Sequence, residues 1–247
     1  MSWERLSAEN YRGVRLPRTL GLWLAVAATT GTALVAALGE AGRAAWGAVA
    51  GALLVAVAGL MDDLAPTGPR GLRGHLRALA SGHMTTGVLK LLVTVASAVI
   101  VIALQPSRPV WVRLSGVVLV AGATNVWNGL DVRPGRALKV FLMAGALIPF
   151  VRISLLPALV VLWVAAWAAL AVDLSERAML GDAGSNLLGF VAGLALFTGL
   201  SDVGVGVAAI VAVALNAVAE IVTFSRVIQA TPPLRWVDGL GRAHGDG

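Results

Sequence analysis

The chain has 247 residues, of which 58% are hydrophobic, and its mean hydropathy of +0.84 excludes an ordinary soluble globular protein. Its 19 Lys and Arg outnumber its 13 Asp and Glu, giving a net charge of +6. No basic segment alternates with aromatic residues as a binder of single-stranded nucleic acid requires, so we expect no nucleic-acid partner. The chain contains no cysteine, which excludes disulfides and thiolate chemistry.

Apolar stretches of roughly the length of a membrane-spanning helix follow one another along the chain, although the fourth, fifth and seventh are short. They predict an all-α, polytopic helical membrane protein with about eight transmembrane helices and a single integral-membrane domain over residues 1–247. An even number of spans places the N-terminal segment 1–18 and the tail 223–247 on the same side. The expected spans are 19–38, 44–61, 86–104, 110–124, 139–151, 153–172, 187–200 and 203–222.

The charges of the connecting segments indicate which side this is. Of the 19 Lys and Arg, 15 fall on the side that holds both termini and the loops 62–85, 125–138 and 173–186. Short cytoplasmic loops carry the excess of Lys and Arg in membrane proteins. We therefore predict that both termini and these three loops are cytoplasmic, in a multi-pass protein of the plasma membrane. The polar residues 1–18 do not resemble a cleavable signal.

The first of these loops begins with the adjacent carboxylates of Asp62 and Asp63. Adjacent carboxylates repel each other, and a divalent cation or a cationic partner removes that cost. The cations that follow suit a phosphate-rich ligand, which Arg binds with two parallel hydrogen bonds. The simpler alternative is a hydrated pair at a helix end, followed by solvated interfacial residues. The cationic candidates for ligand binding are Arg73, His75, Arg77 and Lys90.

In the second loop, Asn125, Asn128 and Asp131 recur every three residues, which places them on one slowly drifting face of a helix. Amide and carboxylate oxygens are ligands for a hard cation such as Mg²⁺. Pro134 and Gly135 are expected to stop this helix, and Arg136 follows as a further candidate for binding an anionic substrate.

The third loop places Asp182 between two glycines and continues with Gly184 and Ser185 into the seventh span. Small residues allow backbone N–H groups to approach an anion at the start of a helix. The alternative is that this segment only caps the helix, since Ser and Asn are good N-cap residues. Both interpretations are compatible. A magnesium ion with phosphate groups is the chemistry that uses all three loops together.

The three segments, in this order and on one side, resemble the polyprenyl-phosphate N-acetylhexosamine-1-phosphate transferase superfamily. The similarity extends over about residues 10–225. One such motif alone is weakly specific, whereas three in the right order are strongly specific. The matching residues are the Asp pair (Asp62, Asp63), the Asn-x-x-Asn-x-x-Asp segment (Asn125, Asn128, Asp131) and the Gly-Asp-x-Gly-Ser segment (Gly181, Asp182, Gly184, Ser185).

The resemblance implies that polyprenyl phosphate attacks the β-phosphorus of a UDP-activated amino sugar, giving polyprenyl-diphospho-sugar and UMP. It implies that Asn128 and Asp182 hold Mg²⁺, which Mn²⁺ could replace. Asp62, assisted by Asp63, would deprotonate or position the lipid phosphate. Arg77 falls where the family has a phosphate-binding lysine. Asp131 and Asn125 would shape the nucleotide side, and a homodimer is left open.

The chain also departs from the family pattern. Leu64 stands where the family has a lysine after the Asp pair, and the late His-rich loop, which helps the family to bind the sugar nucleotide, is missing. One alternative is therefore a catalytically inactive relative that acts as a prenyl-phosphate-binding membrane scaffold. Another is a transporter, for which Glu220 would be the ionisable residue within a span.

Overall fold

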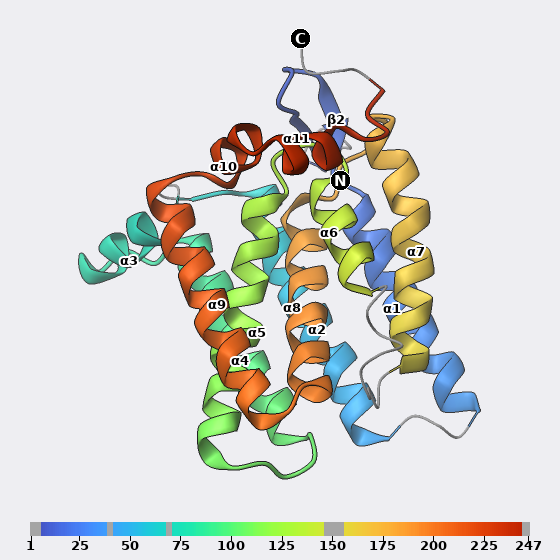
Figure 1. The fold of residues 1–247 in the computed structure, drawn as a ribbon, viewed down its shortest axis with the longest axis vertical. Helices are drawn as coiled ribbons and strands as arrows, with labels where there is room; N and C mark the ends of the chain where they lie inside the picture. Colours follow the sequence, from blue (N-terminus) through green and yellow to red (C-terminus); the bar gives the residue numbers. More distant parts are fainter. Residues whose placement is uncertain (1–5, 39–41, 68–70, 146–155, 244–247) are drawn as a thin grey trace.

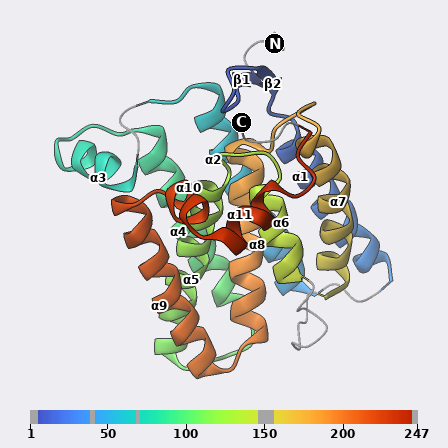
Figure 2. The same cartoon turned by 45° about the horizontal axis from the view of Figure 1, so that its top comes forward.

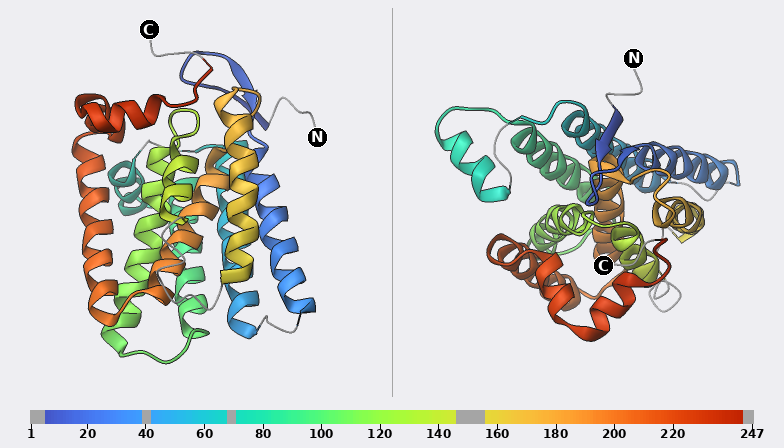
Figure 3. Two further views of the ribbon diagram at one scale, coloured as in Figure 1. Left: turned by 45° about the vertical axis from the view of Figure 1, so that its right-hand side comes forward. Right: turned by 90° about the horizontal axis from the view of Figure 1, so that it is seen from above.

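The computed structural model describes residues 6–38, 42–67, 71–145 and 156–243. Of these residues 77% are helical and almost none lie in a sheet, which confirms the all-α prediction. The long helices run side by side in a single bundle (Figures 1 and 3). These long helices are α1 (Leu20–Ala37), α2 (Arg43–Leu64), α4 (Thr86–Ala103), α5 (Val110–Leu130), α7 (Leu156–Leu174), α8 (Gly181–Gly199) and α9 (Asp202–Ile221).

Five of the described helices, namely α1, α2, α4, α5 and α9, are long and apolar enough to cross a membrane. Within α7, residues Leu159–Leu174 form a shorter apolar helix. Helix α8 has 19 residues, but it begins with Gly-Asp-Ala-Gly-Ser-Asn, and these polar residues lower its hydropathy. The structure therefore contains helices compatible with membrane insertion, as the composition predicts.

Three helices are longer than expected, in the places where the motifs lie. Helix α2 continues to Leu64 instead of ending at residue 61, so it carries Asp62 and Asp63. Helix α5 continues to Leu130 instead of ending at residue 124, and Pro134 and Gly135 lie in the turn that follows it. Helix α8 begins at Gly181 instead of residue 187. Gly181 has φ +69°, a conformation that favours glycine, and its position starts the helix directly at the motif. The motif residues are thus held by helical turns rather than by open loops.

Several short elements were not expected from the sequence. They gather at the end of the bundle where α2, α5, α7 and α9 end and α1, α4 and α8 begin (Figures 1 and 2). Strands β1 and β2 form an antiparallel hairpin in which Ala8 pairs with Leu16. These elements are β1 (Ser7–Glu9), β2 (Arg15–Pro17), α3 (Leu72–Ala80), α10 (Phe224–Ala230) and α11 (Pro232–Gly239). Helix α6 (Arg136–Gly145) begins at the same end and is the described part of the expected fifth span, 139–151.

Helix α8 is the centre of the bundle, where it packs against α1, α2 and α5 (Figure 3). Glycines allow this close packing. A Cβ atom on Gly59 of α2 would lie 2.5 Å from the Asp182 carbonyl oxygen, and one on Gly189 of α8 would lie 2.7 Å from the Thr124 Cα of α5. Both distances are too short for real atoms, so backbone meets backbone at these two crossings.

Some expectations fall outside the described residues. Residues 146–155, which hold the end of the expected fifth span (139–151) and the start of the sixth (153–172), are among them. The others are parts of the terminal segments 1–18 and 223–247, together with three of the cations counted above, Arg5, Arg70 and Arg152.

Candidate functional site

Three helices bring two of the motif aspartates and a lysine into direct contact. Asp62 comes from the last turn of α2, Lys90 from the second turn of α4 and Asp182 from the first turn of α8. The Lys90 Nζ lies 3.0 Å from Asp62 Oδ2 and 2.5 Å from Asp182 Oδ2. Thr86 Oγ1 donates a hydrogen bond to Asp62 Oδ1. A single ammonium group thus joins two motifs that are 120 positions apart in the chain.

Asp63 has different partners from its neighbour Asp62. Its carboxylate lies 2.9 Å from Arg18 Nη1 and accepts a hydrogen bond from the Ala183 backbone N–H at 3.1 Å. The same Arg18 nitrogen donates to the Asp63 carbonyl oxygen at 3.0 Å. Because an N–H group in the first turn of a helix lacks a partner within that helix, Asp63 satisfies one such donor of α8. Asp63 therefore ties α2, α8 and the N-terminal segment together.

The second motif approaches the third from α5. Ser185 Oγ donates to Asn128 Oδ1 at 3.2 Å and lies 3.4 Å from the Asp182 carbonyl oxygen. Asn125 Nδ2 donates to Asn216 Oδ1 of α9 at 2.5 Å, one turn further from the Asp182 carboxylate. Gly184, the remaining motif residue, packs backbone to backbone against Gly21 of α1 and serves the helix crossing.

A cavity of about 410 Å³ opens beside these residues. Asp63, Asp131, Asp173 and Asp182 line it together with Arg18. Burial raises the pKa of the Asp131 carboxyl well above its usual range, and the nearby carboxylates of Asp173 and Asp182 raise it further. A cavity with this excess of carboxylates favours a bound cation, or a ligand that brings one.

At the edge of this cavity, the Arg133 guanidinium lies 5.2 Å from the centre of the Tyr11 ring. Tyr11 belongs to the turn between β1 and β2, so the N-terminal hairpin forms one wall of the cavity. The hairpin is held by Glu176, which accepts hydrogen bonds from Asn10 Nδ2 at 2.8 Å and from Arg12 Nη1 at 3.2 Å.

A second, smaller cavity of about 100 Å³ lies among α3, α4, α5 and α8. Lys90 lines this cavity, while its partner Asp182 lines the larger one. The Lys90–Asp182 contact therefore stands between the two spaces. The other polar residues around the smaller cavity are His75, Thr94, Thr124, Asn125, Asn128 and Asn186.

Three of the expected substrate-binding cations lie elsewhere. Arg73 and Arg77 are exposed on α3, and neither lines the two cavities described above. Arg136 is 3% exposed, and its Nε and Nη2 donate to the two carboxylate oxygens of Asp238 at 2.8 and 2.9 Å. Arg136 thus connects α6 to α11 and has little freedom to bind a substrate.

Several residues of the site were not singled out from the sequence. Arg18 differs little from the other cations when only charge is counted, and its contact with Asp63 emerges only from the fold. Lys90 was a candidate for ligand binding, but its contacts with Asp62 and Asp182 could not be predicted. Asp173 sits in a run of apolar residues with no motif around it, yet its carboxylate accepts the Gly135 N–H at 2.7 Å. The remaining residues are Thr86, Asn186, Asp238 and Tyr11.

Within the described residues, no group of three or more His, Cys, Asp or Glu side chains is arranged to hold a metal ion. Mg²⁺, however, is commonly held by one or two carboxylates while water and substrate phosphates complete its shell. The Asp182 carboxylate and the Asn128 amide oxygen are oxygen donors of that kind. Ser185, whose hydroxyl contacts Asn128 Oδ1 and the backbone carbonyl oxygen of Asp182, joins the two segments that carry them. The donor set therefore fits a magnesium ion that arrives with a phosphorylated substrate.

Comparisons with protein-family models, with curated proteins and with solved structures each found no match. The function is therefore argued from the motifs and the geometry of the site.

Proposed function

We propose that this protein is a Mg²⁺-dependent transferase that moves the sugar-1-phosphate of a UDP-activated amino sugar, of the N-acetylhexosamine type, to polyprenyl phosphate for cell-wall or surface-glycan synthesis. The observation that carries the proposal is the meeting of Asp62, Lys90 and Asp182, with Asn128 beside them, at the end of a bundle of apolar helices. A polar site on such a bundle suits one water-soluble substrate and one substrate from the membrane.

In this reaction an oxygen of the lipid phosphate forms a bond with the β-phosphorus of the UDP-sugar. The bond between that phosphorus and the oxygen bridging to the α-phosphorus breaks, and UMP leaves with the bridging oxygen. Both substrates are anions, so the site must reduce their repulsion and align them. The chain's own cations nearest the motif aspartates, Lys90 and Arg18, are suited to this work.

The contacts suggest a division of roles among the residues. Asp62 deprotonates or positions the acceptor phosphate. Lys90 binds phosphate oxygens, a role that the geometry favours for Lys90 over Arg77. Asp63 holds the first turn of α8 in place. Asp131 lies in the cavity of about 410 Å³, a volume within the usual range for small-molecule sites, where it would face the nucleotide.

The carboxylate of Asp182 and the amide oxygen of Asn128 would hold the magnesium ion, which neutralises charge on the diphosphate when bound. Lys90 also supplies positive charge beside Asp182. We expect Lys90 to shift toward substrate oxygens when the ion is present, since both cations use the same carboxylate.

We further propose that the chain crosses the plasma membrane about eight times, with both termini and the site on the cytoplasmic side. Two observations support this orientation: the excess of Lys and Arg in the segments at the site end, and the location of the β1–β2 hairpin and α11 at that end (Figure 1). UDP-sugars are cytoplasmic compounds, which agrees with a site on this side.

The decisive experiment uses the purified full chain in lipid nanodiscs with polyprenyl phosphate, Mg²⁺ and a panel of UDP-sugars. The expected result is the release of UMP in equal amount to polyprenyl-diphospho-sugar, and its loss on chelation of the metal. If no donor yields UMP while polyprenyl phosphate still binds, the transferase proposal is wrong and the non-catalytic scaffold is the better reading.

A further inference from the structure

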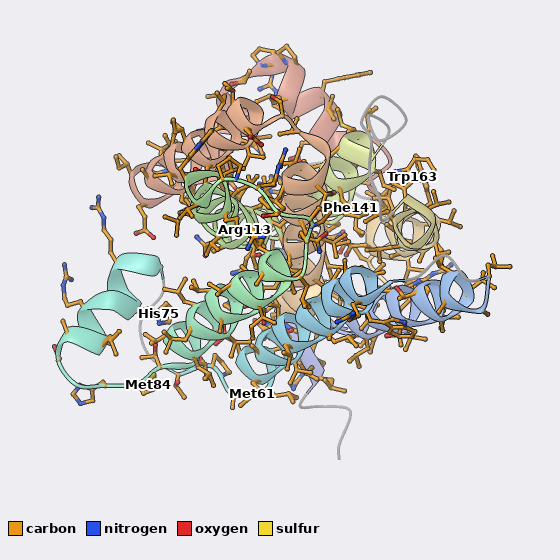
Figure 4. All side chains as sticks on the ribbon, turned by 90° about the horizontal axis from the view of Figure 1, so that it is seen from below. Met61, His75, Met84, Arg113, Phe141 and Trp163 are labelled. Carbon is orange, nitrogen blue, oxygen red and sulfur yellow. The ribbon has the colours of Figure 1, made fainter. Side chains whose placement is uncertain are left out.

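Helix α3 stands outside the bundle. It lies at the end that carries the site and runs crosswise to the long helices, away from the other short elements (Figures 1 and 2). His75 connects it to the bundle: its Nδ1 is hydrogen-bonded to Thr85 Oγ1 at 2.8 Å, and the imidazole packs over Gly87 at the start of α4. Figure 4 shows His75 between α3 and α4.

The outer part of this segment exposes apolar side chains. Leu79 is 41% exposed and Met84, in the turn after the helix, is 63% exposed. The helix has only nine residues, and an isolated helix of that length is not stable in water. Its persistence outside the bundle therefore calls for a surface that covers its apolar side.

The sequence of α3, LRGHLRALA, is strongly amphipathic. It places leucine at positions 72, 76 and 79, spaced by four and three residues, and arginine at 73 and 77, spaced by four. Residues at these spacings share a face of a helix. By this spacing alone, the leucine positions and the arginine positions fall on adjacent sides of a helix, which is the pattern of a helix lying flat in the interface of a membrane.

The charge of the arginines agrees with this location. Arg73 and Arg77 are exposed, and neither forms an ion pair with an acidic residue in the described part of the chain. Arginine near an anionic leaflet is attracted to lipid phosphates, which it binds with two hydrogen bonds. Neither arginine lines the two cavities of the candidate site, so their binding partner is a different one.

We propose that residues 71–84, the α3 arm, form a lipid-binding arm that lies in the headgroup region of an anionic phospholipid leaflet, with Arg73 and Arg77 binding lipid phosphates. His75 anchors the arm to α4, close to Lys90. The arm then holds the headgroups of neighbouring lipids next to the smaller cavity. This inference rests on the membrane placement proposed above, but not on the transferase reaction.

The cysteine-free chain allows a direct test with a single fluorescent label. Leu79→Cys, labelled with an environment-sensitive dye, is placed in vesicles of phosphatidylcholine with increasing phosphatidylglycerol. Lipids with a quencher near the headgroup and aqueous iodide then report on which side of the interface the label lies. We expect lipid quenching and iodide protection to rise with the fraction of phosphatidylglycerol.

The double substitution Arg73→Gln and Arg77→Gln should weaken the preference for the anionic lipid by about 30-fold, about fivefold for each arginine. Arg113→Gln, in the first turn of α5 and far from the α3 arm (Figure 4), is the matched control and should leave the preference for the anionic lipid unchanged. Because the measurement does not involve turnover, it separates failure of this inference from failure of the transferase proposal.

Two outcomes would overturn the inference. A label that iodide reaches equally at every lipid composition would place the arm in water, where a soluble partner or substrate is the ligand. A label that inserts equally with and without the arginines would show an apolar contact with no role for anionic lipid.

Discussion

Asp62 and Asp63 are neighbours in the chain, yet the contacts of Asp62 suit a role in catalysis and those of Asp63 a role in stabilising the fold. The Asp63 side chain is 3% exposed, with both of its carboxylate oxygens bound by groups of the protein. Asp62 is bound by Lys90 and Thr86, two side chains that can rearrange when a substrate arrives. Loss of the Asp63 carboxylate is therefore expected to harm folding, and loss of the Asp62 carboxylate to harm turnover.

Asp182→Asn should abolish turnover while the protein still folds. The carboxylate is proposed to hold the metal ion, and an amide of the same shape is a weaker, neutral oxygen donor. We expect a loss of several kcal/mol of transition-state stabilisation, or about a thousandfold or more in rate. UMP release measures activity, and thermal unfolding in detergent measures folding.

Retained activity in Asp182→Asn would place the metal elsewhere. If Asp182→Asn fails to fold, the residue serves instead to stabilise the start of α8. Ser185→Ala is the matched control, because it removes the hydrogen bond to Asn128 but leaves the carboxylate in place.

Lys90→Ala should reduce kcat/KM by about 10- to 150-fold, because one charge-assisted contact with phosphate is worth about 1.5–3 kcal/mol. Lys90→Arg keeps the charge and should recover part of this loss. The control is Arg113→Ala, which removes a cation from the far end of the bundle (Figure 4). Wild-type kinetics for Lys90→Ala would remove this lysine from the site.

At the scale of elements, the position of Asp182 depends on the crossing of α2 and α8. Gly59 lets the two backbones touch, since a Cβ atom there would lie 2.5 Å from the Asp182 carbonyl oxygen and 2.8 Å from the Ala183 nitrogen. These are backbone atoms, which cannot turn aside as a flexible side chain can.

Gly59→Ala should therefore push the first turn of α8 away from Asp62 and Lys90. We expect a cost of about 1–3 kcal/mol in stability, together with a fall in kcat. In Gly206→Ala the added Cβ would meet Trp111 at an ordinary 3.4 Å, so this variant should be neutral or stabilising. If both variants behave alike in thermal unfolding and in UMP release, the crossing of α2 and α8 accommodates an added Cβ atom more easily than its geometry implies.

The elements also show what could be predicted from the sequence. Apolar length predicted the long helices, and the three-residue spacing of Asn125, Asn128 and Asp131 correctly indicated a helical face. Hydropathy placed the C-terminal end of α5 and the start of α8 wrongly, because it assigns polar residues to loops. In the structure, partners such as Ser185 for Asn128 let these polar residues lie within helices.

For the whole molecule, the order of the motifs indicated that they meet at one end, but the partners of each charge could not be predicted. The fold selects Lys90 rather than Arg77 for the contact with the aspartates, because α3 turns away from the bundle while α4 returns to it. Arg136 and Asp238 are 102 positions apart, and no motif connects them. Such contacts depend on the path of the whole chain.

The contact between Arg136 and Asp238 fastens the C-terminal segment to the rest of the molecule. Asp238 also lies 2.7 Å from Arg242 Nη2, and its carbonyl oxygen accepts a hydrogen bond from Lys139 Nζ at 2.7 Å. Arg242 Nε lies 3.3 Å from the Pro134 carbonyl oxygen, in the turn that follows Asp131. The tail thus supports the turn next to the larger cavity.

Asp238→Asn should lower the free energy of unfolding by about 3 kcal/mol near neutral pH, since it leaves two buried guanidinium groups without their carboxylate. Burial on its own raises the pKa of Asp238, but the hydrogen bonds and charges of Arg136 and Arg242 outweigh it and keep this pKa below its usual value. The stabilisation is therefore complete above the pKa of the unfolded chain, near 4, and is lost as the pH falls through the lower pKa of the folded state. Thermal unfolding of the wild-type protein and of Asp238→Asn between pH 7 and pH 3 should show a difference in stability that narrows only at the acid end of this range. A difference of constant size would mean that Asp238 acts through its shape and not through its charge.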